Sequence, residues 1–162
     1  PPIMGALADA IAKKGTLHMA GCSGCEGSRC LDCNTVCENC ADSCPNRANV
    51  VIKMADGSHQ IVHVDKMCNE CGNCAQFCPW QGKPYKDKIT LFSLPEDFGN
   101  STNPGFLVEA NQVHVRQNDR IWLLNIDERG QLNDVPPPLT DMCRIISHVH
   151  LHHRYLLGGV EV

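Results

Sequence analysis

Two cysteine-rich segments of this chain repeat one another at a constant offset. Three cysteines of the first segment recur in the second, as the pairs Cys37 and Cys71, Cys40 and Cys74, and Cys44 and Cys78. A proline follows the last cysteine of each copy, at Pro45 and Pro79. A repeat at a fixed spacing indicates a duplicated structural unit, and it constrains the fold of this chain more than any other feature.

The second copy has a complete C-x2-C-x2-C-x3-C-P pattern, formed by Cys68, Cys71, Cys74, Cys78 and Pro79. This spacing is typical of bacterial ferredoxins that hold [4Fe–4S] clusters. The two-residue gaps let the backbone curl so that three thiolates reach one cluster, whereas the fourth cysteine ligates the other cluster in two-cluster ferredoxins. The proline lacks an N–H and turns the chain away from the loop.

This crossover of the fourth cysteine predicts two [4Fe–4S] clusters, each held by cysteines of both copies. One cluster is expected to be held by Cys44, Cys68, Cys71 and Cys74, and the other by Cys37, Cys40, Cys78 and one further cysteine. A zinc site is an alternative, but zinc sites pair two C-x2-C knuckles across a longer loop and do not need the Cys-Pro exit. Disulfides are a further alternative, which we do not expect in a cytoplasmic chain.

The remaining ligand follows from the same offset. The position of the first copy that corresponds to Cys68 is Asn34, and Cys33 is its neighbour on the N-terminal side. Because one extra residue can bulge out of a loop, we assign Cys33 as the ligand, with Cys30 as its rival. The other cysteines of this segment are either spare thiols in a linker or part of a third metal site completed by a missing domain, and they are Cys22, Cys25 and Cys30.

The composition is that of a globular chain, since 43% of its 162 residues are hydrophobic and 20% are charged. The net charge of -4 and the lack of a basic run argue against a nucleic-acid partner. No apolar run is long enough to cross a membrane and no signal peptide is visible, so we expect a cytoplasmic protein in which twelve cysteines indicate metal. The chain starts with Pro-Pro and no initiator Met, so we expect a fragment or a processed piece of a longer protein.

We expect an α+β fold in three parts. A linker or helix over residues 1–28, helical from about Met4 to Lys14, precedes a ferredoxin-like two-cluster domain over residues 29–82. The third part, residues 83–162, is expected to be a β-hairpin-rich extension that ends in a helix. Since only 5% of the residues are aromatic, we expect the clusters to replace part of a conventional core.

Three local patterns support this division. Two β-branched runs flank Asp56-Gly57 in the cluster region, which predicts a hairpin. Residues 88–94 are typical of a strand, and residues 112–132 of a hairpin with turns near Asn118-Asp119 and Arg129-Gly130. Apolar residues at helical spacing predict one helix from Asp141 to Leu157.

The predicted terminal helix carries several reactive side chains. His148 and His152 would lie one turn apart and could share a metal ion, but an exposed helix face or a docking surface is the alternative. Cys143 falls on the apolar side and is interpreted as a core thiol. We find no paired carboxylates, nucleophile elbow, phosphate loop or GxGxxG motif, so no catalytic activity is expected from this chain alone.

Four segments resemble the C-terminal ferredoxin-type region of a family of large bacterial iron–sulfur flavoproteins described as selenate reductase subunits. They are RCLDCNTVCENCADSCPNRANV, CNECGNCAQFCPWQGKPYKDKITLF, NPGFLV and DMCRIISHVHLHHRYLLGGVEV. The resemblance implies a larger FAD- and NAD(P)H-binding part, similar to the small subunit of glutamate synthase, which this chain lacks. It also implies electron exchange with molybdenum-enzyme or purine-catabolism partners.

The chain is therefore expected to be an electron-transfer module within a larger flavin- and NAD(P)H-dependent oxidoreductase. FAD and NAD(P)H are expected only on the missing part or on a partner. The alternative is a structural or interaction module that the clusters stabilise without any redox role. Reversible reduction of the clusters separates the two hypotheses.

Overall fold

The computed structural model describes residues 37–79 and 81–157 of the chain. Several of the predicted features lie outside these residues. They are the helix from Met4 to Lys14, the assigned ligand Cys33, its rival Cys30, and the further cysteines Cys22 and Cys25.

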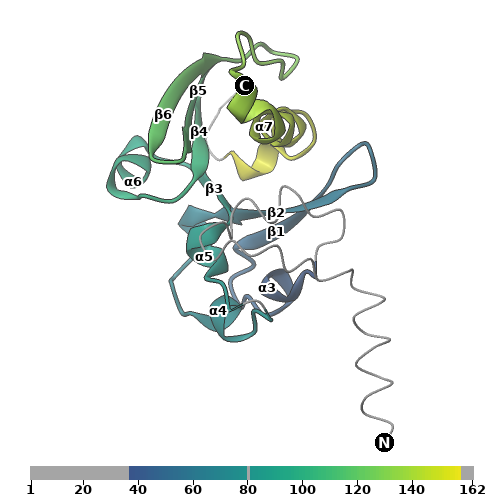
Figure 1. Ribbon diagram of the computed structural model, residues 1–162, viewed down its shortest axis with the longest axis vertical. Coiled ribbons are helices and arrows are strands. Elements are labelled where there is room, and N and C mark those ends of the chain that lie inside the picture. Colours follow the sequence, from purple (N-terminus) through teal and green to yellow (C-terminus); the bar gives the residue numbers. More distant parts are fainter. Residues whose placement is uncertain (1–36, 80, 158–162) are drawn as a thin grey trace, which may run out of the picture.

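A six-stranded mixed sheet, in the order β1-β2-β3-β4-β5-β6, forms the centre of the described structure (Figure 1). The strands are β1 (Asn49–Lys53), β2 (His59–Val64), β3 (Ile89–Phe92), β4 (Gly105–Glu109), β5 (Gln112–Gln117) and β6 (Arg120–Asn125). β3 pairs in parallel with β2 and with β4, and the other neighbours are antiparallel. The sheet runs without interruption across the expected boundary at residues 82 and 83, and that boundary stays a prediction.

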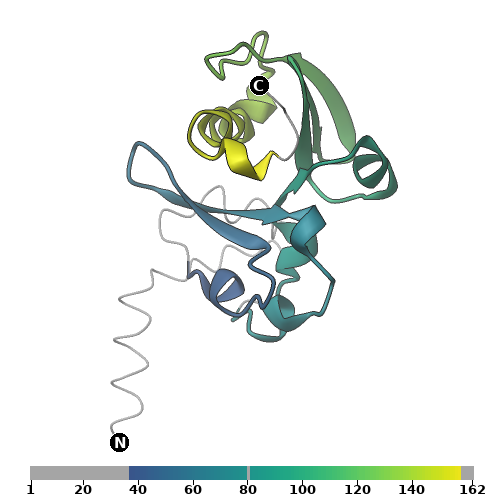
Figure 2. The ribbon, with the colours of Figure 1, turned by 180° about the vertical axis from the view of Figure 1, so that it is seen from behind.

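The helices are short except for the last one. They are α3 (Asn39–Asp42), α4 (Asn73–Gln76), α5 (Pro84–Asp87), α6 (Pro95–Asn100) and α7 (Thr140–His152), with 3-10 turns at Asp65–Met67, Pro137–Leu139 and Arg154–Leu156. Figures 1 and 2 show α3, α4 and α5 on one side of the β1–β2 hairpin and α7 on the other. The β1–β2 hairpin therefore separates the cysteine loops from α7.

The β1–β2 hairpin has two buried faces because side chains alternate along a strand. Ile52, Val62 and Val64 belong to the main core, which packs the sheet against α7. Val51 and Ile61 face the other way, into a second cluster that contains Cys40 and Cys74. The hairpin thus joins the cysteine loops to the main core of the described structure.

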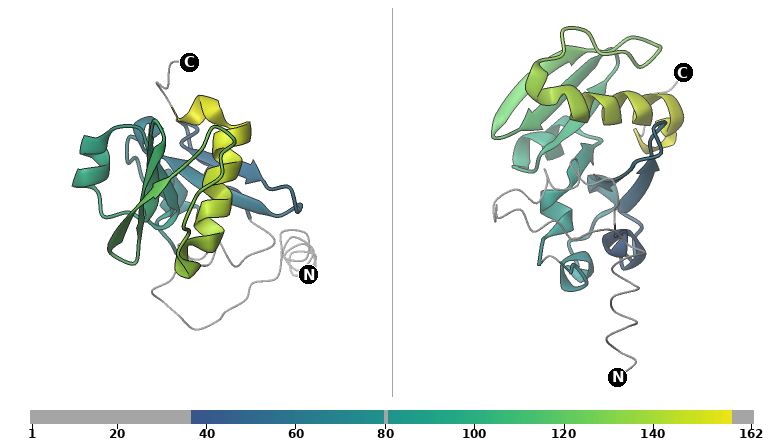
Figure 3. Two further views of the ribbon diagram at one scale, coloured as in Figure 1. Left: turned by 90° about the horizontal axis from the view of Figure 1, so that it is seen from above. Right: turned by 45° about the vertical axis from the view of Figure 1, so that its right-hand side comes forward.

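The predicted apolar face of the terminal helix is confirmed, since Met142, Ile145, Ile146 and Val149 are all buried. Figure 3 shows this helix, α7, crossing the sheet. The predicted end at Leu157 is wrong, because α7 ends at His152.

The early end of α7 has a local cause. The carbonyl of Val149 accepts a hydrogen bond from the N–H of His153 at 2.8 Å, but His153 itself has φ -131°, outside the helical range. A separate 3-10 turn follows and returns Leu156 and Leu157 to the main core, each 5% exposed. The apolar spacing past His152 therefore reflects a second buried segment rather than a longer helix.

Both predicted hairpins are confirmed. In the first, Gly57 has φ +82°, and the N–H of Met54 donates to the carbonyl of Ser58 at 2.8 Å. In the second, Asn118 and Asp119 have φ +50° and +59°, as the two-residue turn between β5 and β6 requires. The strand predicted over residues 88–94 is β3.

Strand β4 and the parallel pairings were not predicted. Gly105 of β4 faces Thr90 of β3 so closely that a Cβ at this position would lie 2.0 Å from the Thr90 carbonyl oxygen. Only glycine fits at this point of the ladder.

In the part of the chain that the structure describes, no helix combines the length and the apolar character that a bilayer span requires.

Candidate metal centre

The two cysteine loops have the same backbone structure. Each contains a short helix, α3 or α4, and these helices begin at corresponding positions of the repeat, Asn39 and Asn73. The residue before each helix is left-handed, with φ +58° at Glu38 and φ +80° at Gly72. The duplication seen in the sequence is therefore also a duplication of local structure.

The hydrogen bonds of the two loops correspond as well. The carbonyl of Glu38 accepts from the N–H groups of Ala41 at 2.9 Å and Asp42 at 3.0 Å. The carbonyl of Gly72 accepts from the N–H groups of Ala75 and Gln76, both at 3.0 Å. Each loop thus closes through corresponding hydrogen bonds of its own backbone.

The last cysteine of each copy accepts a backbone N–H at its sulfur. The N–H of Ala48 donates to Cys44 Sγ at 3.2 Å, and the N–H of Gly82 donates to Cys78 Sγ at 3.3 Å. The two donors occupy corresponding positions, since each follows its cysteine by the same number of residues. The N–H of Glu70 donates to Cys68 Sγ at 3.3 Å. Such donors stabilise a negatively charged sulfur, which is the form that binds iron.

The middle cysteines of the two copies lie inside the structure. Cys40 and Cys74 are 6% and 7% exposed, and both belong to the apolar cluster around Ile61. The helices α3 and α4 that carry them are in contact. The two copies are therefore neighbours in space as well as repeats in sequence.

Cys44 of the first copy lies close enough to two cysteines of the second copy to affect their ionisation. Burial is the main cause that raises the pKa of Cys68 and of Cys74, and Cys44 raises the pKa of both further by charge repulsion. Backbone N–H donors act in the opposite direction, from Glu70 on Cys68 and from Tyr85 on Cys74. These three cysteines belong to one of the predicted ligand sets.

The exposure of the other predicted ligands differs. Cys71 is exposed, whereas Cys37 and Cys78 are half-buried. Cys33 lies outside the described residues, so seven of the eight predicted ligands can be located. Cys78, which accepts the N–H of Gly82, belongs to the predicted ligand set that also contains Cys37 and Cys40.

Two polar residues beside the cysteines were missed by the sequence analysis. Asn49 Nδ2 donates to the carbonyl of Cys40 at 2.9 Å. Burial raises the pKa of Cys74, and the Asn49 side chain offsets part of that rise. His63 Nδ1 lies 2.8 Å from Asn49 Oδ1. The only signal in the sequence was a polar residue at the start of one β-branched run and another inside the next.

The described cysteines do not converge on a single point. Within residues 37–79 and 81–157, no three His, Cys, Asp or Glu side chains gather as they would around one metal ion. A [4Fe–4S] cluster binds one thiolate at each iron, so its ligands surround a larger body and need not converge. The donor set, all thiol sulfurs with N–H groups directed at three of them, fits a cluster.

The histidines at the end of α7 lie next to one another. The ring of His148 is 4.6 Å from that of His152 and 5.7 Å from that of His153, measured between centroids. Burial lowers the pKa of His148, and the charges of His152 and His153 lower it further.

Cys143 is 5% exposed and burial raises its pKa to about 11, in agreement with its interpretation as a core thiol.

Comparison with known proteins gives one kind of relative. A protein of Escherichia coli strain K12 named "Putative oxidoreductase YgfK" is 66% identical over 139 residues, which cover 85% of this chain and 14% of that protein. The protein of the same name from Escherichia coli O157:H7 matches to the same extent. The chain therefore spans only about a seventh of the length of these curated relatives.

The name of these relatives supports a redox-related role for the chain at a coarse level. It does not mention selenate, so the selenate reductase assignment that the resemblance implied is not carried further. No family model matches the chain. No solved structure matches it either.

Proposed function

We propose that this chain is an electron-transfer module that carries two [4Fe–4S] clusters. Each cluster would be held by three cysteines of one copy and the last cysteine of the other. The ligands are Cys33, Cys37, Cys40 and Cys78 for cluster one, and Cys44, Cys68, Cys71 and Cys74 for cluster two. The proposed ligands come from both copies, in a ferredoxin-like arrangement.

The observation that carries the proposal is that the two cysteine loops pack against each other. Cys40 of the first copy and Cys74 of the second copy lie in one apolar cluster, and the helices that carry them are in contact. Charge repulsion from Cys44 also acts on Cys68 and Cys74 of the other copy. This supports the crossover of the fourth ligand, which distinguishes a two-cluster ferredoxin module from two separate sites.

The protein's own groups would hold and tune the clusters. When bound, a [4Fe–4S] cluster takes up and returns one electron at a time. The N–H groups of Ala48, Glu70 and Gly82 point at ligand sulfurs, where they favour the more negative, reduced state. The apolar packing around Cys40 and Cys74 keeps water from the inner side of the loops.

The family resemblance implies a source for the electrons. The matched part covers 14% of a relative that is named an oxidoreductase, so most of that relative's length has no counterpart in this chain. We propose that a flavin part takes an electron pair from NAD(P)H as hydride and passes single electrons to this module. A molybdenum-enzyme or purine-catabolism component, as the family resemblance implies, would be the partner that exchanges electrons at the other end.

Anaerobic reconstitution of the chain tests the proposal. About eight irons and about eight sulfides per chain are expected for two [4Fe–4S] clusters. Dithionite should reduce the clusters reversibly and give a low-temperature electron paramagnetic resonance (EPR) signal. The matched control is Cys143→Ala, which removes a core thiol and should keep all the iron.

Two other results would contradict the proposal in different ways. If the chain bound zinc and no sulfide, the cysteines would form zinc sites and not iron–sulfur clusters. Full iron and sulfide with no reduction over the roughly −700 to +450 mV range of such clusters would leave a structural or interaction module. A coupled assay with the flavin part of the longer protein would then test electron flow from NAD(P)H.

A further inference from the structure

We propose that His148 and His152 form a site for one divalent transition-metal ion at the C-terminal end of α7. The two imidazoles bind an ion such as Ni²⁺, Cu²⁺ or Zn²⁺, and water completes its coordination. The site does not depend on the proposed iron–sulfur clusters, because α7 and the cysteine loops lie on opposite sides of the β1–β2 hairpin (Figures 1 and 2).

The helix sets the spacing of the two ligands. His148 and His152 are four residues apart and both belong to α7. Residues at this spacing lie one above the other on the same face of a helix, and helical zinc sites use two histidines at this spacing. The N–H of His153 donates to the carbonyl of Val149 at 2.8 Å, which closes the last turn of the helix. The backbone that carries both ligands is therefore ordered before an ion binds.

The two rings already have the separation that a shared ion requires. The centroids of His148 and His152 are 4.6 Å apart, and the ring planes are inclined by 46°. Two imidazoles at neighbouring positions of one ion, with metal–nitrogen bonds of about 2.0 Å, have centroids roughly 4.5 to 5 Å apart. Binding therefore needs little movement of the side chains.

The surroundings of the pair favour metal over an ion pair. His59 and His114 each lie beside a glutamate, at 3.3 Å and 3.0 Å, whereas among the described residues no ion pair involves His148 or His152. Burial, and then the charges of the neighbouring histidines, lower the pKa of His148. A neutral imidazole is the form that binds metal. His152 is exposed and His148 is half-buried, so an ion reaches the pair from solvent.

His153 is a neighbour of the site and not a third ligand. Its centroid is 5.7 Å from that of His148, and its Nδ1 lies 3.3 Å from the hydroxyl oxygen of Tyr155. Over residues 37–79 and 81–157, no group of three His, Cys, Asp or Glu side chains is placed to hold one ion. The site therefore has two protein ligands.

Nuclear magnetic resonance (NMR) of the reconstituted full chain, titrated with Ni²⁺ at about pH 7.5, tests the site, since imidazoles with a pKa of about 6.5 are then mostly neutral. The unpaired electrons of Ni²⁺ broaden the signals of nearby ring protons, and Ni²⁺ does not oxidise thiols as Cu²⁺ does. Substoichiometric Ni²⁺ should broaden the signals of His148 and His152 first. His148→Asn and His152→Asn should each weaken Ni²⁺ binding at least about tenfold, since substitutions outside the ligand set of a metal site already cost about that much.

The matched control is His114→Asn. His114 lies on β5 and pairs with Glu109, so this variant also loses one histidine but none of the proposed ligands. Its Ni²⁺ affinity should equal that of the wild type. His153→Asn should also stay close to the wild type, because His153 is assigned no bond to the ion. Ni²⁺ held by thiols does not enter the comparison, because the titration follows histidine signals.

Two results would overturn the site. They are equal broadening of the His114 and His148 signals, and unchanged Ni²⁺ affinity in His148→Asn and His152→Asn. A loss in His153→Asn as large as that in His148→Asn would overturn the assignment of two ligands. If His148→Asn does not fold, His152→Asn gives the deciding titration, because His152 is exposed. Failure to form iron–sulfur clusters would refute the proposed function and leave this site to be judged by the same titration.

Discussion

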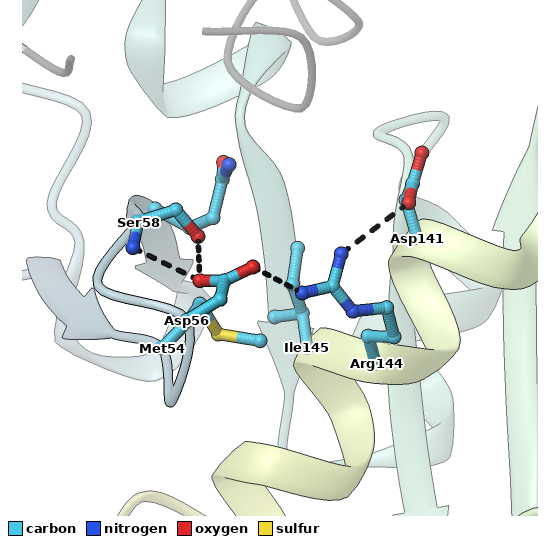
Figure 4. A pocket seen from close by; sticks show the side chains of 7 residues that line it. Met54, Asp56, Ser58, Asp141, Arg144 and Ile145 are labelled. Carbon is cyan, nitrogen blue, oxygen red and sulfur yellow. Dashed lines mark hydrogen bonds and ion pairs between the residues drawn. The ribbon is translucent and has the colours of Figure 1, made fainter. Parts of the chain in front are cut away.

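Arg144 of α7 donates from Nη2 to Asp56 Oδ2 at 2.5 Å, across 88 positions of sequence (Figure 4). Asp56 lies in the turn of the β1–β2 hairpin, where the N–H and the hydroxyl of Ser58 donate to its other oxygen at 2.9 Å and 2.6 Å. Asp141 lies 3.8 Å from the same guanidinium. These groups border a cavity of about 80 Å³ between the hairpin turn and α7. The contact joins the tip of the β1–β2 hairpin, which lies between the two cysteine loops in the sequence, to the terminal helix.

The first prediction concerns the pH dependence of stability. The hydroxyl and N–H of Ser58, and then Arg144, hold the pKa of Asp56 well below its usual range. A carboxyl with a lowered pKa in the folded state stabilises the protein above its unfolded pKa of about 3.9, and this stabilisation is lost as the pH falls below that value. Asp56→Asn should therefore flatten the dependence of the melting temperature on pH between about pH 4 and pH 2.

Circular dichroism melting curves at several pH values measure this effect. The effect should be small because Asp56 is exposed to solvent. Arg144→Ala serves as a comparison and should lose only the share of this pH-dependent stabilisation that the guanidinium contributes. Parallel curves for the wild type and Asp56→Asn would show that the contact carries no pH-dependent stability.

The second prediction is that Cys44 serves cluster two and Cys78 serves cluster one. Cys44→Ser should lose about four of the roughly eight irons, and so should Cys78→Ser. Double variants then identify the cluster. Cys44→Ser with Cys74→Ser should lose no more iron than either alone, because both remove the same cluster. Cys44→Ser with Cys37→Ser should lose nearly all iron.

Iron counting of the two double variants distinguishes the crossover from ligation within each copy. No EPR signal has to be assigned to a particular cluster. If each copy held its own cluster, the two double variants would exchange results. Cys143→Ala is again the control for loss of a thiol outside the ligand sets, since this side chain lies in the main core.

The third prediction concerns the ligand that precedes the described residues. Cys33→Ser should cost one cluster and Cys30→Ser should leave both, because the shorter loop to Cys37 suffices for one cluster edge. The difference in closure entropy between the two loops is well under about 1 kcal/mol, so geometry rather than entropy decides. Iron counting of the two single variants checks the register, and the reverse pattern would make Cys30 the ligand.

The fourth prediction is that removal of iron unfolds the cysteine region first. Cys40 and Cys74 form a small apolar cluster with Ile61, which the bound clusters are expected to complete. The main core between the sheet and α7 contains none of the predicted ligands that the structure describes. After chelation, hydrogen exchange should rise over α3 and α4, while β5, β6 and α7 keep their protection.

Hydrogen exchange with mass spectrometry, before and after chelation under anaerobic conditions, gives the comparison. The loss of stability on chelation should also appear as a lower melting temperature. Equal exchange over α3 and α4 in the two states would mean that the loops are stable without metal. The clusters would then contribute nothing to the fold.

Local patterns in the sequence predicted several parts of this structure. The turns at Gly57 and at Asn118-Asp119 are formed by residues that tolerate positive φ, so their positions follow from a few neighbouring residues. The two cysteine loops repeat because their hydrogen bonds close within each loop. The apolar face of α7 follows from spacing alone, whereas its end at His152 does not, since the apolar spacing continues into the next turn.

The sequence by itself determined the repeat, the identity of the predicted thiol ligands and the hairpins, because each depends on residues close together in the chain. Only the tertiary structure decided that β3 pairs in parallel with β2 and β4, and that Gly105 lies against Thr90. It also brought the Asn49 side chain to the carbonyl of Cys40 and to His63. Parallel pairing and contacts between loops bring together segments that are far apart in the sequence. No periodic pattern in the sequence marks which of these segments will pair, so the packing of the whole chain decides it.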